Sequence, residues 1–287
     1  MKKNLIYFLV LLLFPAVLAA CSEDDLSSTS VIQPPQVVQN DFDRWLDRHY
    51  LAPYNIEFQY RYTDIESSMG YYLTPADYNQ SIALAKLVIA LCLEPYDEVT
   101  GSRDFIRAYF PKIIFLTGSP AYKSNGSIIL GTAEGGKKIT LFNVDALQIA
   151  SIDASTNYFK TIHHEFTHIA NQTIEFPKEY ELISPGYVEQ WKNMKDQEAY
   201  DAGFISPYAM SEPSEDFAEM VGIMLSNSRA EWEVLLDKPA TQDGKDKLQQ
   251  KLEMVLNYYR DVWNVDLYAL QEECEKAIYE VVNNVNP

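Results

Sequence analysis

The spacing of hydrophobic residues changes near the middle of the chain, from every second position to every third or fourth. Apolar and aromatic side chains alternate with polar ones over 56–62, which predicts a strand with one buried face. Shorter runs predict strands over 112–117, 127–130 and 137–143, the last one after a Gly135-Gly136 turn. The helical spacing then predicts helices over 157–173, 214–226, 229–236, 244–262 and 267–282.

One more helix is predicted inside the strand-rich half. Thr74 supplies an N-cap, Pro75 a first helical position and Asp77 an acid in the first turn, ahead of an apolar run that reaches about Leu93. A small mixed sheet followed by a largely helical lobe is an α+β layout. Because no internal repeat or second linker interrupts it, residues 41–287 are predicted to form one unit with two lobes.

The N-terminus has the pattern of an export signal. Two lysines precede an apolar stretch from Leu5 to Ala20, which is too short and too early for a stop-transfer helix, so residues 1–20 are interpreted as a signal peptide. The four residues before and at Cys21 resemble a bacterial lipobox, in which the cysteine is lipidated and becomes the mature N-terminus. An ordinary cleavage site beside a cysteine is the alternative. Residues 21–40 then form the lipidated cysteine and a flexible tether.

The sequence also predicts where the protein is anchored. No later apolar run approaches the roughly 20 residues that span a bilayer, so we expect membrane contact through the lipid anchor only. Residues 22–25, Ser-Glu-Asp-Asp, resemble the acidic export signal of lipoproteins on the outer face of some outer membranes. This favours an outer-membrane lipoprotein exposed at the cell surface. The alternative is the periplasmic face, with these residues simply opening a solvated linker.

The net charge bears on the partners of the protein, and the cysteine content bears on whether it has a disulfide. Loss of Lys2 and Lys3 with the signal peptide takes the formal net charge from −18 to −20, which argues against nucleic acid and anionic lipid surfaces as partners. An oxidising compartment would permit a disulfide between Cys92 and Cys274. However, Cys92 lies in the apolar run 87–93, so two buried thiols are the favoured interpretation.

Residues 161–168, Thr-Ile-His-His-Glu-Phe-Thr-His, contain the motif H-E-x-x-H on a predicted helix. Side chains four residues apart stack on one helix face, so His164 and His168 can reach the same zinc ion. Glu165 lies about 100° further round the helix, where it meets water at that ion. A separate apolar stripe seats the helix in the core: Phe159, Ile162, Phe166 and Ile169.

Two histidines leave a catalytic zinc site one protein ligand short. The metzincin extension would need glycine at 171 and histidine at 174, but the chain has Asn171 and Ile174 there. The best candidate for the third ligand is Glu215, at the start of a predicted helix. Glu219 lies one turn further on the same face, so one of the two can bind zinc while the other accepts the second N–H of a ligand histidine.

Two neighbours of these residues are left out of the site. His163 points away from His164, and a lone histidine is more often a core or surface residue. Asp216 points away from Glu215 by about 100° and is interpreted as a first-turn acid favoured by the helix dipole. The alternative for the whole acidic run is a solvated helix start.

The two motifs together resemble a known group of enzymes. H-E-F-T-H at 164–168 followed by E-D-F-A-E at 215–219 is similar to the glutamate-ligand zincins (gluzincins), and among them to the catalytic domain of anthrax toxin lethal factor. The resemblance implies a zincin-like fold in which Glu215 binds zinc and Glu219 buttresses a ligand histidine. It also implies that Tyr208, seven residues before the ligand glutamate, helps to stabilise an oxyanion.

A second resemblance covers the lipobox, the site motifs and the chain length. Together they are similar to the substrate import-associated zinc metallohydrolase lipoproteins, which accompany outer-membrane transporters of the TonB-dependent kind. This resemblance implies a role in substrate import. It also implies a TonB-dependent transporter and its partner lipoprotein as partners.

These residues predict a zinc-dependent metallohydrolase, and most simply a metallopeptidase, with one Zn²⁺ per chain. Glu165 is expected to be the general base and Tyr208 an oxyanion donor. In zincins the edge strand ahead of the active helix pairs with an extended substrate, so residues 137–143 are expected to bind a peptide by strand addition. Two alternatives stay open. One is a non-catalytic binding or assembly lipoprotein of an import complex with a structural zinc, and the other is a hydrolase of an amide in peptidoglycan or a glycan-linked peptide.

Overall fold

The computed structural model describes residues 38–67, 70–123, 126, 128–147 and 152–285. The signal peptide, Cys21, the acidic residues after it and most of the tether lie outside the described residues. Residues Asn40–Pro287 form one compact unit. In the described part of the chain, no helix has the length and apolar character needed to cross a membrane.

The unit opens with helical segments that the hydrophobic pattern does not predict. Helix α2 (Asp41–Leu46) begins at Asn40, whose side chain accepts from the N–H of Asp43 in a capping box. It continues through a π-helical turn η2 (Asp47–Leu51) into α3 (Ala52–Tyr54). The chain then reverses at Asn55, which has a φ of 56°, and enters the sheet.

The main sheet has four strands in the order β1-β2-β6-β5. Strands β1 (Glu57–Gln59), β2 (Ile113–Leu116) and β6 (Lys138–Leu141) are parallel, and β5 (Gly131–Glu134) is antiparallel to β6. A second, two-stranded sheet joins β3 (Ala121–Tyr122) to β4 (Ile128–Ile129). The strands predicted within 56–62, 112–117, 127–130 and 137–143 are therefore present.

The prediction that residues 137–143 form the edge strand is wrong. Strand β6 is paired on both sides, with β2 and with β5, so its backbone has no free edge. Both glycines of the turn Gly135-Gly136 have positive φ, which suits a tight hairpin that folds residues 131–134 back along β6. Strand β5 is therefore the edge strand on the β6 side of the sheet, although its sequence, Gly-Thr-Ala-Glu, shows no alternation of apolar residues.

The helix predicted after residue 74 begins later than the sequence suggested. Helix α4 (Tyr78–Val88) is capped by Asp77, whose carboxylate accepts from the N–H groups of Asn79 and Gln80. A π-helical segment η3 (Ile89–Leu93) carries it into α5 (Glu94–Thr100), and α6 (Asp104–Tyr109) follows. Asp77 displaces Thr74 as the cap because its carboxylate satisfies two of the unpaired N–H groups of the first turn.

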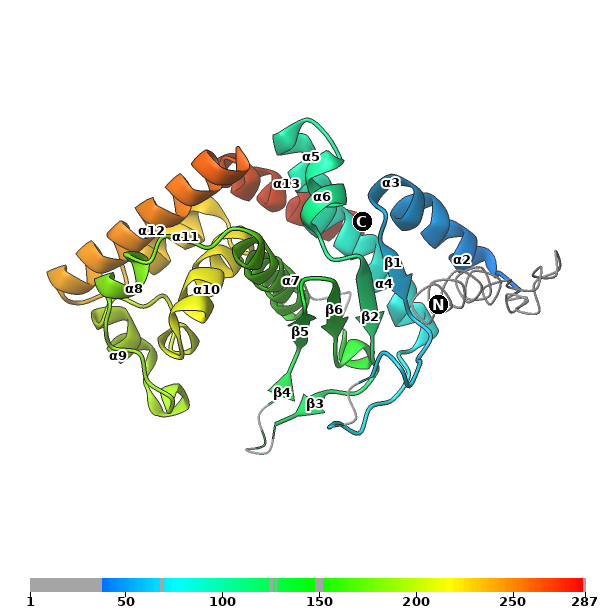
Figure 1. Ribbon diagram of the computed structural model, residues 1–287, viewed down its shortest axis with the longest axis horizontal. Helices are drawn as coiled ribbons and strands as arrows, with labels where there is room; N and C mark the ends of the chain where they lie inside the picture. The colour runs from blue at the N-terminus through cyan, green and yellow to red at the C-terminus, as the bar shows by residue number, and fades with distance from the viewer. Residues whose placement is uncertain (1–37, 68–69, 124–125, 127, 148–151, 286–287) are drawn as a thin grey trace, which may run out of the picture. The chain divides into compact units, whose positions relative to one another are not determined.

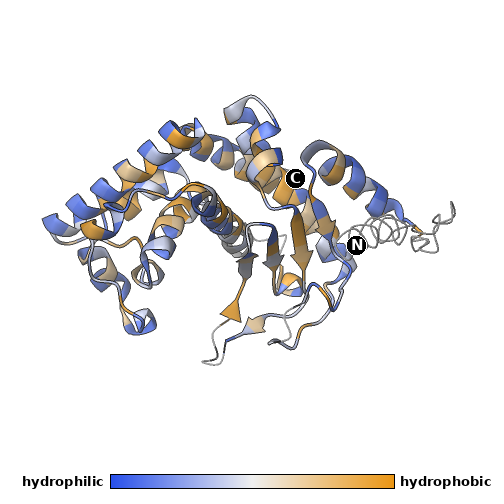
Figure 2. Cartoon of the chain, viewed as in Figure 1, coloured by the Kyte–Doolittle hydropathy of each residue, from blue (hydrophilic) through white to orange (hydrophobic). Residues whose placement is uncertain are grey.

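The second half is helical, as predicted, and five of its helices match the expected ranges to within a few residues: α7 (Ile152–Thr173), α10 (Pro213–Leu225), α11 (Arg229–Leu236), α12 (Gln242–Trp263) and α13 (Leu267–Val285). Shorter segments connect them: η4 (Val144–Ala146), α8 (Tyr180–Ile183), η5 (Trp191–Asn193), α9 (Asp196–Asp201) and η6 (Tyr208–Met210). Strand β2 is hydrophobic throughout in Figure 2, whereas the long helices mix hydrophobic and polar residues. The fold is α+β, as the sequence predicted.

Helix α7 lies between strand β5 and helix α10, so it contacts both halves of the unit (Figure 1). Two glycines, one on β5 and one on α10, allow both elements to pack closely against α7. A Cβ atom on Gly131 of β5 would lie 2.4 Å from the Thr161 methyl of α7, and one on Gly222 of α10 would lie 3.1 Å from the His164 Cβ. The packing therefore brings the H-E-x-x-H residues against the sheet edge and against α10.

The two cysteines of the described chain are free and buried. The Cys274 thiol lies 4.0 Å from the carbonyl oxygen of Leu91, in the π-helical segment η3. This confirms the interpretation of Cys92 and Cys274 as buried thiols.

Candidate active site

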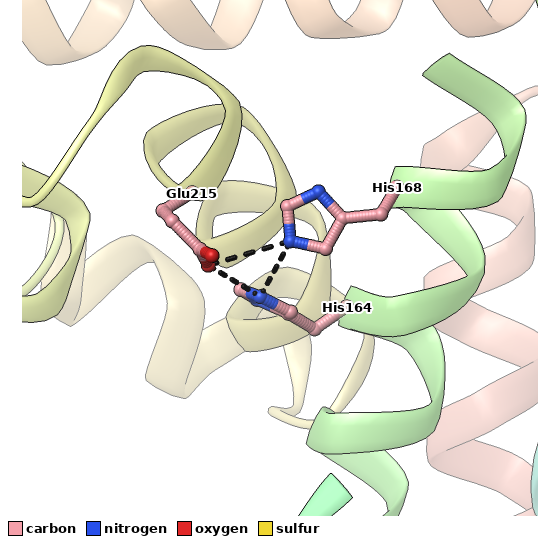
Figure 3. Close-up of side chains that lie close together, drawn as sticks. All are labelled: His164, His168 and Glu215. Carbon is pink, nitrogen blue, oxygen red and sulfur yellow. Dashed lines mark hydrogen bonds and ion pairs between the residues drawn. The ribbon is translucent and has the colours of Figure 1, made fainter. Parts of the chain in front are cut away.

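Two residues of α7 and one of α10 converge on a single point (Figure 3). The Nε2 atoms of His164 and His168 lie 3.1 Å apart, and the Oε2 atom of Glu215 lies 2.9 Å from the first and 3.3 Å from the second. All three ligand atoms are within 4.8 Å of one another. Two imidazole nitrogens and a carboxylate oxygen form one of the donor sets of catalytic zinc sites, and tetrahedral Zn²⁺ places its ligands about 3.3 Å apart. The residues therefore fit zinc.

The geometry follows from the periodicity of α7. His164 and His168 lie one turn apart on the face turned toward α10. The apolar residues predicted to seat the helix are all buried: Phe159, Ile162, Phe166 and Ile169. Because the packing face is fixed in the core, the ligand face is held in one orientation.

Glu219 orients the first histidine. Its Oε2 atom lies 3.2 Å from Nδ1 of His164, and neither atom has another hydrogen-bond partner among the described residues. Its Oε1 atom accepts from Nζ of Lys160 at 2.6 Å and from Oγ of Ser206 at 3.0 Å. A proton held on Nδ1 leaves Nε2 with its lone pair toward the site, which is the usual effect of such a partner. Lys160 and Ser206 belong to no motif, so the sequence did not indicate that either one contacts Glu219.

The carboxylates of Glu215 and Glu219 favour a positive charge where the three ligand atoms converge. Burial opposes a charged imidazole, but Glu215 and Glu219 outweigh it and raise the pKa of His164 to about 9. Burial likewise opposes the charge on Glu215, yet His164 and His168 lower its pKa far below the usual range. This electrostatic balance suits a cation at the same place.

Glu165 lies beside the three converging atoms without being one of them. Burial raises the pKa of its carboxyl, although both site histidines act in the opposite direction. Its carboxylate also accepts a hydrogen bond from the backbone N–H of Ala133, on strand β5. A raised pKa makes the carboxylate a stronger base, which suits a group that takes a proton from water. The contact with Ala133 was not predicted, because a backbone donor has no sequence signal.

Tyr208 lies next to His164 and Glu215. It begins the 3-10 segment η6, its ring lies 5.9 Å from the His164 ring, and its hydroxyl is hydrogen-bonded to the Glu215 carboxylate. Trp191 packs edge-on against it, with ring centroids 4.9 Å apart. Burial and the Glu215 charge raise the pKa of Tyr208, so the phenol keeps its proton and can donate.

The interpretation of Asp216 as a simple first-turn acid needs correction. Asp216 points away from Glu215 into the core, where it is fully buried and lies 2.6 Å from Nζ of Lys251 on α12. The Tyr187 hydroxyl donates to the same carboxylate oxygen. Glu219 is also buried, so the run 215–219 is not a solvated helix start. The partner of Asp216 lies 35 residues away in sequence, which explains why the local pattern could not reveal it.

His163 stays outside the cluster, as predicted. It is buried, its Nδ1 atom accepts from the Tyr96 hydroxyl at 3.3 Å, and its ring donates to the carbonyl of Leu91. Burial lowers the pKa of His163 to about 4, so the ring is neutral. His163 therefore ties α7 to the π-helical segment η3 and the start of α5.

A helix carrying H-E-x-x-H, a glutamate from a facing helix and a small sheet at their side are the features of the zinc-binding metallopeptidase class. Residues 35–268 match the family described as "Putative zinc-binding metallo-peptidase", and the chain belongs to this family. It is similar to the crystal structure of a "putative zinc-binding metallo-peptidase" from Bacteroides caccae, with 41% sequence identity and a TM-score of 0.74. That match covers 88% of this chain and 97% of the other. No curated protein matches the chain.

Proposed function

We propose that the protein is a metallopeptidase of the glutamate-ligand type, in which His164, His168 and Glu215 hold one Zn²⁺. The convergence of their three donor atoms within 4.8 Å is the observation that carries this proposal. The description of the family as zinc-binding supports the choice of metal. The buried contact between Glu219 and His164 supports it as well, because metal-binding histidines usually donate their second N–H to such a group.

Each group at the cluster has a separate role in the proposed hydrolysis. Zn²⁺, when bound, supplies Lewis-acid polarisation of a carbonyl and acidification of water. Glu165, held by the Ala133 N–H, takes the proton from the attacking water and passes it to the leaving amine. Tyr208 turns its hydroxyl from Glu215 to the oxyanion that develops on the scissile carbonyl.

The edge of the sheet supplies a binding surface for an extended peptide. Phe142 N–H donates to the Leu130 carbonyl, so alternate residues of β5 face β6, and the backbone groups of Gly131 and Ala133 face outward. Because the Ala133 N–H is bonded to Glu165, the groups offered to a substrate are those of Gly131 and the carbonyl of Ala133. Both residues lie beside Glu165. A substrate strand can pair there by β-strand addition, with its scissile bond next to the histidines.

The rival function, a binding lipoprotein with a structural zinc, is less well supported. Structural zinc sites have four protein ligands, whereas three side chains converge among the described residues. Glu165 lines the same cavity as His164, which supports its assignment as the base. A peptide-library cleavage assay with the zinc-loaded protein tests the enzyme directly. Cleavage of peptides supports a peptidase, and cleavage of peptidoglycan fragments alone would favour the amide-hydrolase alternative.

Metal analysis is expected to give about one zinc per chain. His164→Ala or His168→Ala should abolish zinc binding, because the two remaining side chains cannot hold the ion firmly. His163→Ala is the matched control, since this neighbour has no part in the cluster. Elemental analysis of the purified variants is the measurement. Unchanged zinc in both ligand variants would show that the ion, if present, binds elsewhere.

We further propose that the protein is an outer-membrane lipoprotein anchored through Cys21, exposed at the cell surface and associated with substrate import. The lipobox-like residues and the acidic run after Cys21 support this. Cys21→Ser should leave the protein outside the membrane fraction. Protease treatment of intact cells tests exposure, and digestion only after lysis would place the protein on the periplasmic side. Co-purification of a TonB-dependent transporter would support the import role.

A further inference from the structure

Two cavities adjoin at the site and differ in charge. One, called here the Lys160 cavity, has a volume of about 230 Å³ and is lined by Lys160, Trp191 and Glu219 together with residues 128–131. The other, the Glu212 cavity, is lined by Glu175 and Glu212 among others. Glu165, Tyr208 and Gly131 line both cavities, so a chain that crosses the site contacts one cavity on each side of the scissile bond.

The direction of β5 determines which cavity lies before the scissile bond of a paired peptide and which lies after it. Strand β5 runs from Gly131 to Glu134, and residues 128–131 line the Lys160 cavity, whereas residues 131–133 line the Glu212 cavity, with Ile129 common to both. A peptide that pairs antiparallel to β5, the more stable arrangement, runs from Ala133 toward Gly131. Its residue before the scissile bond then meets the Glu212 cavity, and its residue after the bond meets the Lys160 cavity.

Lys160 is partly accessible from its cavity. Its side chain is 30% exposed, while its partner Glu219 is only 2% exposed. The Glu219 carboxylate is shared between Lys160, Ser206 and His164, so its charge is already spread over three donors. An ammonium group has three donors, and among the described residues Lys160 has one carboxylate partner. The donors that remain are available to a ligand.

A second ammonium group reinforces this charge. Lys123 is exposed and lines the same cavity. Lys123 also lines the Glu212 cavity, but there the carboxylates of Glu175 and Glu212 repel an anion. A carboxylate is therefore favoured on one side of the scissile bond and disfavoured on the other.

We propose that the Lys160 cavity binds a carboxylate on the substrate residue that follows the scissile bond, and that Lys160 is the residue that selects it. The proposal rests on the metallopeptidase function and adds the substrate class. The carboxylate belongs either to an aspartate or glutamate side chain or to the free C-terminus of that residue. Both present the same anion to the ammonium group, and a charge-assisted hydrogen bond recognises either one.

Matched peptides distinguish a side-chain carboxylate from a C-terminal carboxylate. One series, amidated at its C-terminus, carries Glu, Gln or Lys after the bond, and a second ends at that position with a neutral residue as free acid or amide. We expect kcat/KM to be at least about tenfold higher for Glu than for Gln, or for acid than for amide, as charge-assisted hydrogen bonds warrant. Glu placed before the bond should bring no gain.

Variants link the preference to Lys160. Lys160→Gln should reduce the Glu-to-Gln ratio of kcat/KM to near one, Lys160→Arg should preserve it, and Lys276→Gln on α13 is the matched control that keeps the wild-type ratio. Because Lys160 also contacts Glu219, zinc content is measured for each variant, and each ratio is taken within a single variant. A loss of metal then affects both peptides equally.

A binding measurement tests the cavity without turnover. In the Glu165→Gln background, calorimetry should show that a product peptide beginning with Glu binds about tenfold more tightly than one beginning with Gln. Adding Lys160→Gln should remove the difference. Cleavage without a carboxylate preference, or with the preference before the bond, overturns this inference and leaves the peptidase function intact. Failure to cleave any peptide overturns the peptidase function itself.

Discussion

Replacing Glu165 by glutamine is expected to reduce peptide hydrolysis by at least about two orders of magnitude, because the variant keeps the shape of the side chain but lacks the base. Zinc content and melting temperature should stay close to those of the parent protein, since Glu165 is not one of the three converging residues. The measurements are kcat/KM on a cleaved peptide, elemental analysis and thermal unfolding.

Glu215→Ala is the variant with which Glu165→Gln is compared. It removes a proposed ligand, so zinc affinity should fall, and the melting temperature should fall with it because metal binding is linked to folding. Glu219→Ala should weaken metal affinity by about 10- to 100-fold, as expected for a group that orients a ligand histidine. If Glu165→Gln lost its zinc while Glu215→Ala retained it, the roles assigned to the two glutamates would be wrong.

Asp216→Ala is expected to lower the free energy of unfolding by about 3–5 kcal/mol, because it leaves the ammonium group of Lys251 buried without its carboxylate. Both side chains are fully buried, and burial raises the pKa of Asp216 to about 6 even beside Lys251. The remaining contacts of Lys251, the Gly203 carbonyl and the rings of Phe204 and Tyr180, cannot neutralise its charge. Chemical denaturation of the single variant measures the loss.

The double variant Asp216→Leu, Lys251→Met is the control. Removing both charges leaves no unpaired ion, and apolar replacements of buried pairs are often neutral. It should therefore recover most of the stability that the single variant loses. A single variant as stable as the parent would show that water reaches Lys251, and that the pair contributes little.

Local sequence signals predicted much of this protein. Helix α11 has the predicted range, 229–236, and α7 carries the histidines on one face and the apolar stripe on another. Strand β2 also lies where its apolar run predicted it. These features follow from residues within a few positions of one another, because helical and strand periodicity are set by the local backbone. The second motif, E-D-F-A-E, made Glu215 the candidate third ligand, and its carboxylate lies 2.9 Å from Nε2 of His164.

Only the tertiary structure decided which strand is the sheet edge and which charges are partners. Strand β5 lies at the edge because a hairpin folds it back along β6, and the alternation of side chains does not encode strand order. Lys160 meets Glu219 across 59 residues of sequence, and Asp216 meets Lys251 from another helix. Such pairs form when packed helices bring distant positions together, so no pattern in the neighbouring residues could reveal them.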